Sequence, residues 1–242
     1  MITIATLLWA PNRQSLPFST HYTESDAEKL YRGFRRNLSV PFRFVCFVDH
    51  PRRFAEPIEQ MPIRGEPNYG SCIQPYEMNE AMILVGLDTI VVGNCDHLAA
   101  YALGADKMAV PRDPFFPQTV CNGVALVPAG HAWVAAERPD GANDMEWIRS
   151  VWKRGDAAVI DELFPRQVVS YKGHARKHGL EPETAIVYFH GQLKPAELRH
   201  VGWIDRHFHQ NVHVGHSTER DACLVAECAG EETLACRETP GV

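Results

Sequence analysis

The feature that most limits the fold of this chain is the alternation of short apolar runs with segments of helical periodicity. Residues 2–9 and 42–48 (FRFVCFV) are apolar and rich in β-branched or aromatic side chains, as buried strands are. Between them, residues 24–38 place apolar side chains at helical spacing, and the segment ends before Pro41. This order of strand, helix and strand predicts an α/β fold with a mostly parallel central sheet flanked by helices.

The same pattern continues toward residue 189. We predict further strands of this sheet at 82–92, 107–110, 120–127, 165–171 and 185–189, and a second helix at 143–153. Residues 62–75 contain three prolines and two glycines, which predicts a loop near the ligand site. Asp49 directly follows the second strand and is a candidate nucleotide contact, because ligands of open α/β sheets bind beyond the carboxyl ends of the strands.

Length and charge distribution predict one domain and a tail. The 242 residues, 45% of them hydrophobic, can form one medium-sized core, which we place at residues 1–208. Residues 209–242 have little hydrophobic periodicity, and from residue 217 onward there are six acidic residues and two basic ones. That segment carries 2 − 6 = −4 of the total charge of −6. We predict an acidic, poorly patterned C-terminal tail without a chemical role.

Composition also limits the partners. A net charge of −6 gives no support to nucleic-acid binding, which usually needs a basic face. No run approaches the roughly 18 apolar residues of a membrane span, and the apolar amino terminus lacks a basic leader and is better explained as a core strand. Seven cysteines, an odd number without CxxC spacing, indicate reduced thiols and a cytoplasmic location.

Two distant segments carry the residue types of a metal–diphosphate pocket. Asp88 lies within MILVGLDTIVV and His190 within IVYFHGQLKP, each near the end of an apolar run. A carboxylate and an imidazole at one sheet edge can hold a divalent cation. Lys194 adds a point charge suited to phosphate oxygens, and Gly191 leaves room for close approach of the backbone.

These motifs resemble those of a known protein family. Over residues 1–208 the chain resembles a bacterial or phage-type GT-A glycosyltransferase related to the glycogenin-like family eight, whose pattern is a DxD strand followed late in the chain by HGxxKP. The matching segments are LYRGFRRNL, PFRFVCFVD, LDTIVVGNCDHL, FPRQVVSYK and FHGQLKP. The resemblance implies a single Rossmann-like GT-A domain. It also implies a nucleotide-sugar donor, usually UDP-linked, with Mn²⁺ or Mg²⁺ between protein and diphosphate, and a glycan, lipid-linked or protein acceptor.

The resemblance also implies roles for individual residues. It assigns metal binding to Asp88 and His190 and diphosphate contacts to Asp88, Gly191 and Lys194. The end of the first strand, at Thr6 and Leu8, matches the nucleotide-binding segment. Asn122, followed by Gly123, resembles the asparagine that touches the donor sugar, and Asp144 resembles an acidic position near that sugar. In retaining relatives the acceptor attacks on the leaving-group face, which makes Asp144 a sugar-positioning carboxylate rather than a base.

One departure from the family's DxD pattern leaves two functions open. The first aspartate of the DxD pattern is replaced by Gly86, which supplies no ligand. A cation would then keep two protein ligands, although cations at nucleotide sites often have few. One prediction is an active, hexosyltransferase-type enzyme, and the resemblance leaves both a retaining and an inverting outcome open. The alternative is a catalytically weak GT-A-like domain that binds a nucleotide sugar or glycan.

Each site residue also has a purely structural explanation. Asp88 precedes TIVV and could be a turn or cap residue, and His190 could be a core histidine whose hydrogen bonds are satisfied. Lys194 could be a solvated loop charge. Asn122 with Gly123 is a common turn pair, and Asp144 could cap the helix that contains Trp147.

Overall fold

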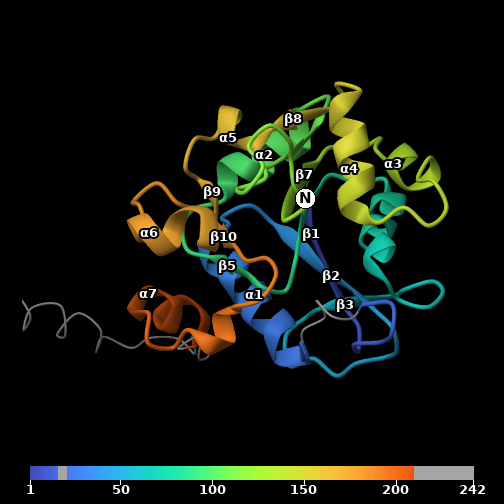
Figure 1. Cartoon of the computed structure of the whole chain (residues 1–242). Helices are drawn as coiled ribbons and strands as arrows, with labels where there is room; N and C mark the ends of the chain where they lie inside the picture. Colours follow the sequence, from blue (N-terminus) through green and yellow to red (C-terminus); the bar gives the residue numbers. More distant parts are fainter. Residues whose placement is uncertain (16–20, 210–242) are drawn as a thin grey trace, which may run out of the picture. The chain divides into compact units, whose positions relative to one another are not determined.

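The computed structural model describes residues 1–15 and 21–209. Seven strands form one sheet in the order β3-β2-β1-β4-β7-β6-β8 (Figure 1). They are β1 Ile2–Leu8, β2 Phe42–Val48, β3 Glu59–Pro62, β4 Met82–Val85, β6 Met108–Val110, β7 Val124–Val127 and β8 Ala157–Val159. β7 runs antiparallel to β4 and β6, whereas the other pairs are parallel. The predicted α/β fold with a mostly parallel sheet is confirmed.

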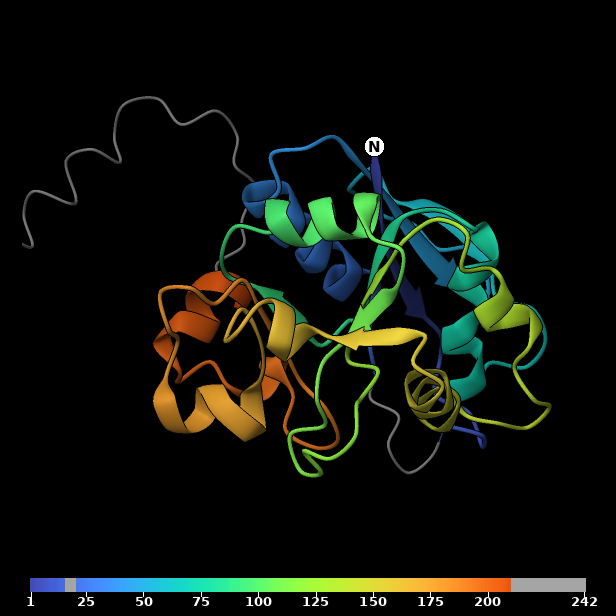
Figure 2. The same cartoon turned by 90° about the horizontal axis from the view of Figure 1, so that it is seen from above.

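Helices cover both faces of this sheet. Figure 2 shows α1 and α2 along one face and η1 with α4 along the other. The α-helices are α1 Glu24–Asn37, α2 Asp96–Gly104, α3 Trp133–Ala136, α4 Asp144–Lys153, α5 Ile160–Leu163, α6 Arg176–His178 and α7 Gly202–Ile204. The 3-10 helices are η1 Tyr69–Met78 and η3 Pro195–Glu197, and the π-helices are η2 Tyr171–Ala175 and η4 Asp205–His209.

Side-chain alternation along β1 divides the core into two layers. Ile4 and Leu8 belong to the apolar layer that includes Phe34 of α1. Ala5 belongs to the opposite layer, with Tyr76 of η1. Each large apolar side chain buried in these layers contributes about 1.5–3 kcal/mol to stability. The face of the sheet toward which each strand residue points is therefore strongly fixed, and this decides which residues of β1 can face a ligand.

A second, three-stranded sheet corrects two predictions. Its order is β5-β10-β9, with β5 Thr89–Val91, β9 Val168–Ser170 and β10 Ile186–Tyr188. The run 82–92 is therefore not one strand, because the chain leaves the large sheet after β4 and turns at Gly86, whose carbonyl accepts the Thr89 N–H at 3.2 Å. The segments predicted at 165–171 and 185–189 do form strands, but in this second sheet and not in the large one.

Other boundaries differ in smaller ways. The prediction for 62–75 is wrong in part, since η1 begins at Tyr69, after Asn68 accepts the N–H of Gly70, and it accommodates Pro75. The short strands β3 and β8 and the helix α2 were not predicted. The predicted strand at 42–48 and helix at 143–153 agree with β2 and with α4 to within one residue.

The predicted tail lies almost entirely outside the described residues, which end at 209, so the division into 1–208 and 209–242 stays a prediction. Among the residues described, no helix has the length and apolar character needed to cross a bilayer.

Candidate active site

A cavity of about 340 Å³ lies at the edge of the large sheet where β1, β4 and β6 end. Its wall combines the turn between β4 and β5, the loop between β6 and β7, the start of α4, and the segment after β10. This volume lies in the range of small-molecule sites, about 300–1,000 Å³. The edge is the one where open α/β sheets bind ligands.

Asp88 and Lys194 meet in this wall although 106 positions separate them in the sequence. The Lys194 ammonium donates to Oδ2 of Asp88, and the two side chains are only 12% and 14% exposed. The ring of Tyr22 lies 5.9 Å from the ammonium. A carboxylate and an ammonium that are both largely withdrawn from water stabilise each other, so Lys194 is not the solvated loop charge of the structural explanation. Asp88 does lie in the turn between β4 and β5, as its structural explanation expects.

His190 lines the same cavity. Its Nε2 lies 2.8 Å from Oγ of Ser170, and the edge of the Phe115 ring packs at 5.0 Å between centroids. Burial lowers the pKa of His190, and the nearby Lys172 ammonium lowers it further. The imidazole is therefore neutral near pH 7, as a metal ligand must be. Its Nε2, however, is already bonded to a hydroxyl.

The ligand set for a divalent metal is incomplete. Asp88 and His190 both face the cavity, but within residues 1–15 and 21–209 no three His, Cys, Asp or Glu side chains are grouped so as to hold an ion. One oxygen of Asp88 is bonded to Lys194. Mn²⁺ and Mg²⁺ prefer several oxygen ligands. These two residues do not form a metal site by themselves.

A second polar pair lines the cavity. Asn122 Nδ2 donates to Oδ2 of Asp144 at 3.0 Å, and Oδ1 of Asn122 is buried without a hydrogen-bond partner in the described structure. Burial raises the pKa of Asp144, although the bond from Asn122 opposes this shift. The helix-cap explanation of Asp144 is wrong, because Asn143 caps α4 by accepting the N–H of Glu146 at 2.8 Å. A buried acceptor without a partner is suited to a ligand hydroxyl.

Thr6 and Leu8 are placed differently from the other predicted site residues. Their side chains are 0% and 1% exposed, and Leu8 packs in the layer with α1. The cavity is lined instead by Leu7 and Trp9, because side chains alternate between the two faces of a strand. The nucleotide contact predicted for Thr6 and Leu8 stays a prediction, and it would have to come from their backbone.

Sequence reasoning missed several lining residues. Tyr69 and Cys72 belong to η1, where only a loop was predicted, and Asp113 begins a loop after β6. Asp113 accepts the N–H groups of Phe115 and Phe116 at 2.9 and 3.1 Å, which shapes that loop. Its position directly beyond a strand end was the signal that could have identified it.

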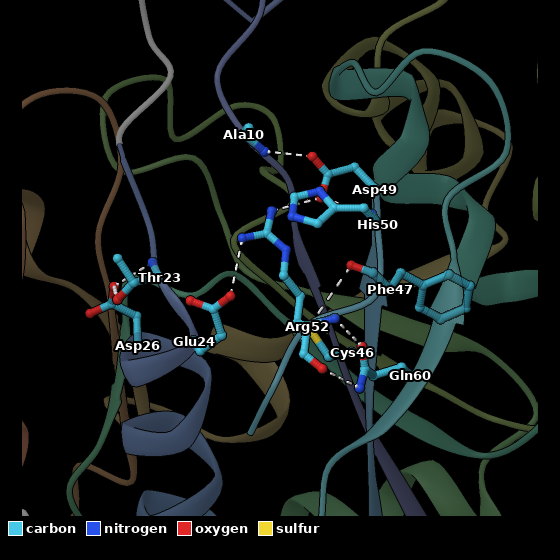
Figure 3. A network of polar contacts seen from close by, with 10 residues as sticks. All are labelled: Ala10, Thr23, Glu24, Asp26, Cys46, Phe47, Asp49, His50, Arg52 and Gln60. Carbon is cyan, nitrogen blue, oxygen red and sulfur yellow. Dashed lines mark hydrogen bonds and ion pairs between the residues drawn. The ribbon is translucent and has the colours of Figure 1, made fainter. Parts of the chain in front are cut away.

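Asp49 lies at the end of β2 but is bound within the protein (Figure 3). Its Oδ2 accepts the N–H of Ala10 at 3.0 Å, and its Oδ1 pairs with Arg52 at 2.7 Å. Arg52 also reaches Glu24, the first residue of α1, at 3.3 Å. Asp49 is not among the residues that line the cavity. Its carboxylate joins β1, β2 and α1, and the predicted nucleotide contact has no support from this geometry.

Comparison with known proteins adds the class of the fold. No family model and no curated protein sequence matches the chain. Solved structures do match, and they are glycosyltransferases of the GT-A type, so the chain has a GT-A fold. The glycosyltransferase GlyE of Streptococcus pneumoniae TIGR4, in its apo form, superposes with a TM-score of 0.54 at 14% identity over 85% of this chain. The match spans 59% of GlyE.

A second neighbour has a length closer to that of this chain. An active-site mutant of LgtC superposes with a TM-score of 0.56 at 10% identity, over 86% of this chain and 94% of LgtC. The galactosyltransferase LgtC in complex with donor and acceptor sugar analogs gives 0.53 at 11% identity, over 90% and 98%. At such identities the likeness concerns the fold. The glycogenin-like family therefore stays a prediction.

Proposed function

We propose that this chain is a glycosyltransferase that moves a hexosyl group from a nucleoside-diphosphate sugar, UDP-linked, to a glycan, lipid-linked or protein acceptor. The observation that carries this proposal is that an ion pair and an amide–carboxylate hydrogen bond line one cavity of a GT-A fold. Asp88 with Lys194 and Asn122 with Asp144 come from four separate segments. The LgtC neighbour was crystallised with donor and acceptor sugar analogs, which supports a sugar-transfer function by analogy.

The main electrostatic problem of this reaction is the leaving group. The bond between the anomeric carbon and the diphosphate oxygen breaks, and its electron pair stays on the diphosphate. An acceptor hydroxyl oxygen bonds to the anomeric carbon and gives up its proton, which a departing diphosphate oxygen accepts if attack occurs on the leaving-group face. The Lys194 ammonium stabilises the developing charge without reorganisation, because Asp88 already fixes its position.

The second pair positions the sugar. An ionised Asp144 accepts hydrogen bonds from sugar hydroxyls, and the free Oδ1 of Asn122 accepts one more. No protein base is required in this scheme, because a departing diphosphate oxygen accepts the proton of the acceptor hydroxyl. Retention of configuration stays a prediction from the sequence.

Two further predictions belong to this proposal. If the cation that the sequence resemblance implies, Mn²⁺ or Mg²⁺, is used, Asp88 and His190 would hold it and it would add positive charge beside the leaving group; the alternative is that lysine side chains alone supply this charge. A cytoplasmic location agrees with the free thiols of Cys46, Cys72, Cys95 and Cys121.

The second candidate function is a catalytically weak domain that binds a nucleotide sugar or glycan. Gly86 favours it, since a glycine at that position contributes neither a metal ligand nor an acceptor for a ribose hydroxyl. Both candidates share the binding step and differ in turnover.

The test measures binding and turnover together. UDP, UDP-glucose, UDP-galactose, UDP-N-acetylglucosamine and GDP-mannose are titrated by calorimetry, and nucleotide release from each sugar donor is followed with and without Mn²⁺. Binding with release supports the enzyme, and binding without release or transfer supports the binding domain. Failure of every nucleotide to bind would contradict both. Asp144→Asn is compared with Asp140→Asn, whose carboxylate is exposed on the surface.

A further inference from the structure

The ion pair in the cavity wall exists because residue 86 is a glycine. A Cβ placed on Gly86 would lie 2.8 Å from Oδ1 of Asp88, closer than carbon and oxygen atoms that are not bonded approach each other. The Asp88 carboxylate therefore uses the space that any larger side chain at position 86 would need. With Gly86 in place, the other oxygen of Asp88 reaches Lys194. The glycine at position 86 and the buried ion pair of Asp88 with Lys194 are therefore structurally linked.

A second ammonium lies beside the first. Lys172 Nζ is 3.5 Å from the point that a Cβ of Gly191 would occupy, and Gly191, at φ +61°, lines the cavity. In the described part of the chain, Lys172 has no acidic partner within ion-pair distance. Burial lowers the pKa of Lys172, and the Lys194 charge lowers it further. Two neighbouring ammonium groups, only one of which is paired with a carboxylate, favour an anion at this point.

The two lysines and Asp88 together carry a net positive charge before any ion binds. Lys194 and Lys172 contribute two positive charges and Asp88 one negative charge. The sum is 2 − 1 = +1 before any ion binds. A divalent cation would enter beside two ammonium groups that repel it, with one free carboxylate oxygen to hold it.

We propose that Lys194 and Lys172 together hold the diphosphate of the donor in place of a divalent metal ion. This inference rests on the proposed function, because it concerns the same donor site. In this arrangement Asp88 positions Lys194 and is not a metal ligand. Gly191, in the left-handed backbone region, brings the main chain close to the phosphates without a side chain between them.

The test titrates UDP and inorganic pyrophosphate into the full chain by calorimetry, once with EDTA and once with Mn²⁺. We expect the two dissociation constants of UDP to differ by less than about threefold. In EDTA, Lys194→Ala and Lys172→Ala should each weaken binding by about tenfold or more, the usual effect of losing one charge-assisted hydrogen bond. Lys177→Ala is the matched control, since that ammonium is exposed on α6 and should leave affinity unchanged.

Gly86→Asp supplies the reciprocal test. The new carboxylate displaces Asp88 from Lys194 and adds a metal ligand, so UDP binding should weaken in EDTA and recover with Mn²⁺. If Lys194→Ala fails to fold, as judged by its melting curve, Lys172→Ala still decides the matter, because Lys172 belongs to no ion pair in the described structure.

The outcomes separate this inference from the proposed function. Wild-type UDP binding that falls by about tenfold or more in EDTA overturns the ammonium pair but leaves the glycosyltransferase proposal intact. Failure of UDP and pyrophosphate to bind under both conditions overturns both. Binding that persists in EDTA and depends on both lysines supports the inference.

Discussion

Two clusters of charged side chains at the carboxyl ends of neighbouring strands handle their charges in opposite ways. In the Arg52 cluster, formed by Glu24, Asp49 and Arg52 (Figure 3), each carboxylate has a cationic partner inside the protein. In the cavity, Asp144 has an amide as its side-chain partner, and beside the cavity, near Gly191, Lys172 has no acidic partner in the structure described. The first cluster is complete without a ligand and the second is not.

The pKa shifts of the two clusters have opposite effects on charge. Burial alone would raise the pKa of Asp49, but hydrogen bonds from Ala10 and Arg52 outweigh it and the pKa is lowered. In the cavity and beside it, burial dominates, so that the pKa of Asp144 is raised and that of Lys172 is lowered. The protein stabilises the charged forms in the Arg52 cluster and disfavours them in the cavity, as ligand sites often do.

The largest effect should come from changing Asp144, one of the two residues of the polar pair that faces the cavity. Asp144→Asn should weaken binding of the correct UDP-sugar relative to UDP, because the neutral amide is a poorer acceptor for sugar hydroxyls, and it should slow transfer on the order of 100-fold. Calorimetry and a nucleotide-release assay measure both quantities. Equal affinities of wild type and variant for the sugar nucleotide would show that Asp144 does not touch the sugar.

Arg52→Met should have the next largest effect, on stability. It leaves Asp49 and Glu24 without their shared cation, and breaking a partly buried ion network costs about 1–3 kcal/mol. Urea unfolding at pH 7 measures this loss. Arg35→Met, on an exposed position of α1, is the control and should change the free energy of unfolding little. An unchanged free energy of unfolding in Arg52→Met would mean that the Arg52 cluster does not hold β2 to α1.

Asp144→Asn should raise stability while it lowers function. A carboxyl group whose pKa is raised by folding stabilises the protein when protonated, and that contribution is lost as the pH rises through the folded pKa. At pH 7 the ionised wild-type group therefore destabilises the fold, and the neutral amide should gain about 0.5–2 kcal/mol. The gain should vanish in acid. A variant less stable than wild type at pH 7 would contradict the burial argument.

The smallest effect concerns the acid side of the stability curve. The lowered pKa values of Asp49 and Glu24 stabilise the fold above the unfolded values, about 3.9 and 4.3, and this contribution disappears as the pH falls through the folded values. The stability difference between wild type and Arg52→Met should therefore shrink on acidification. Unfolding measured at pH 7 and near pH 3 tests it, and a difference that grows in acid would reverse the assigned sign.

How much of the fold could be predicted depended on the length of the local pattern. β2 and α1 have long, regular apolar patterns and were predicted almost to the residue. The run 82–92 was mistaken for one strand because both halves are buried, and burial hides the turn at Gly86 from any reading of hydrophobicity. The short β8, with three residues, has too little pattern to stand out.

The site shows the same division. The motif residues Asp88, His190 and Lys194 line the same cavity, and the roles expected for them stay predictions. Lys172 and the ion pair of Asp88 with Lys194 could not be predicted, since no local signal links residues 106 positions apart.

The sequence by itself determined the α/β class and the residue types that a diphosphate site requires, because strand and helix periodicity and side-chain chemistry are local properties. Only the tertiary structure decided which charges meet. It placed the carboxylate of Asp88 over Gly86 and against Lys194, left Asn122 and Asp144 facing the cavity, and turned Leu7 instead of Leu8 toward it. The physical reason is that the pairing of charged groups, and the choice of which strand residues face the cavity, depend on distances between segments. These distances are set only when the core packs.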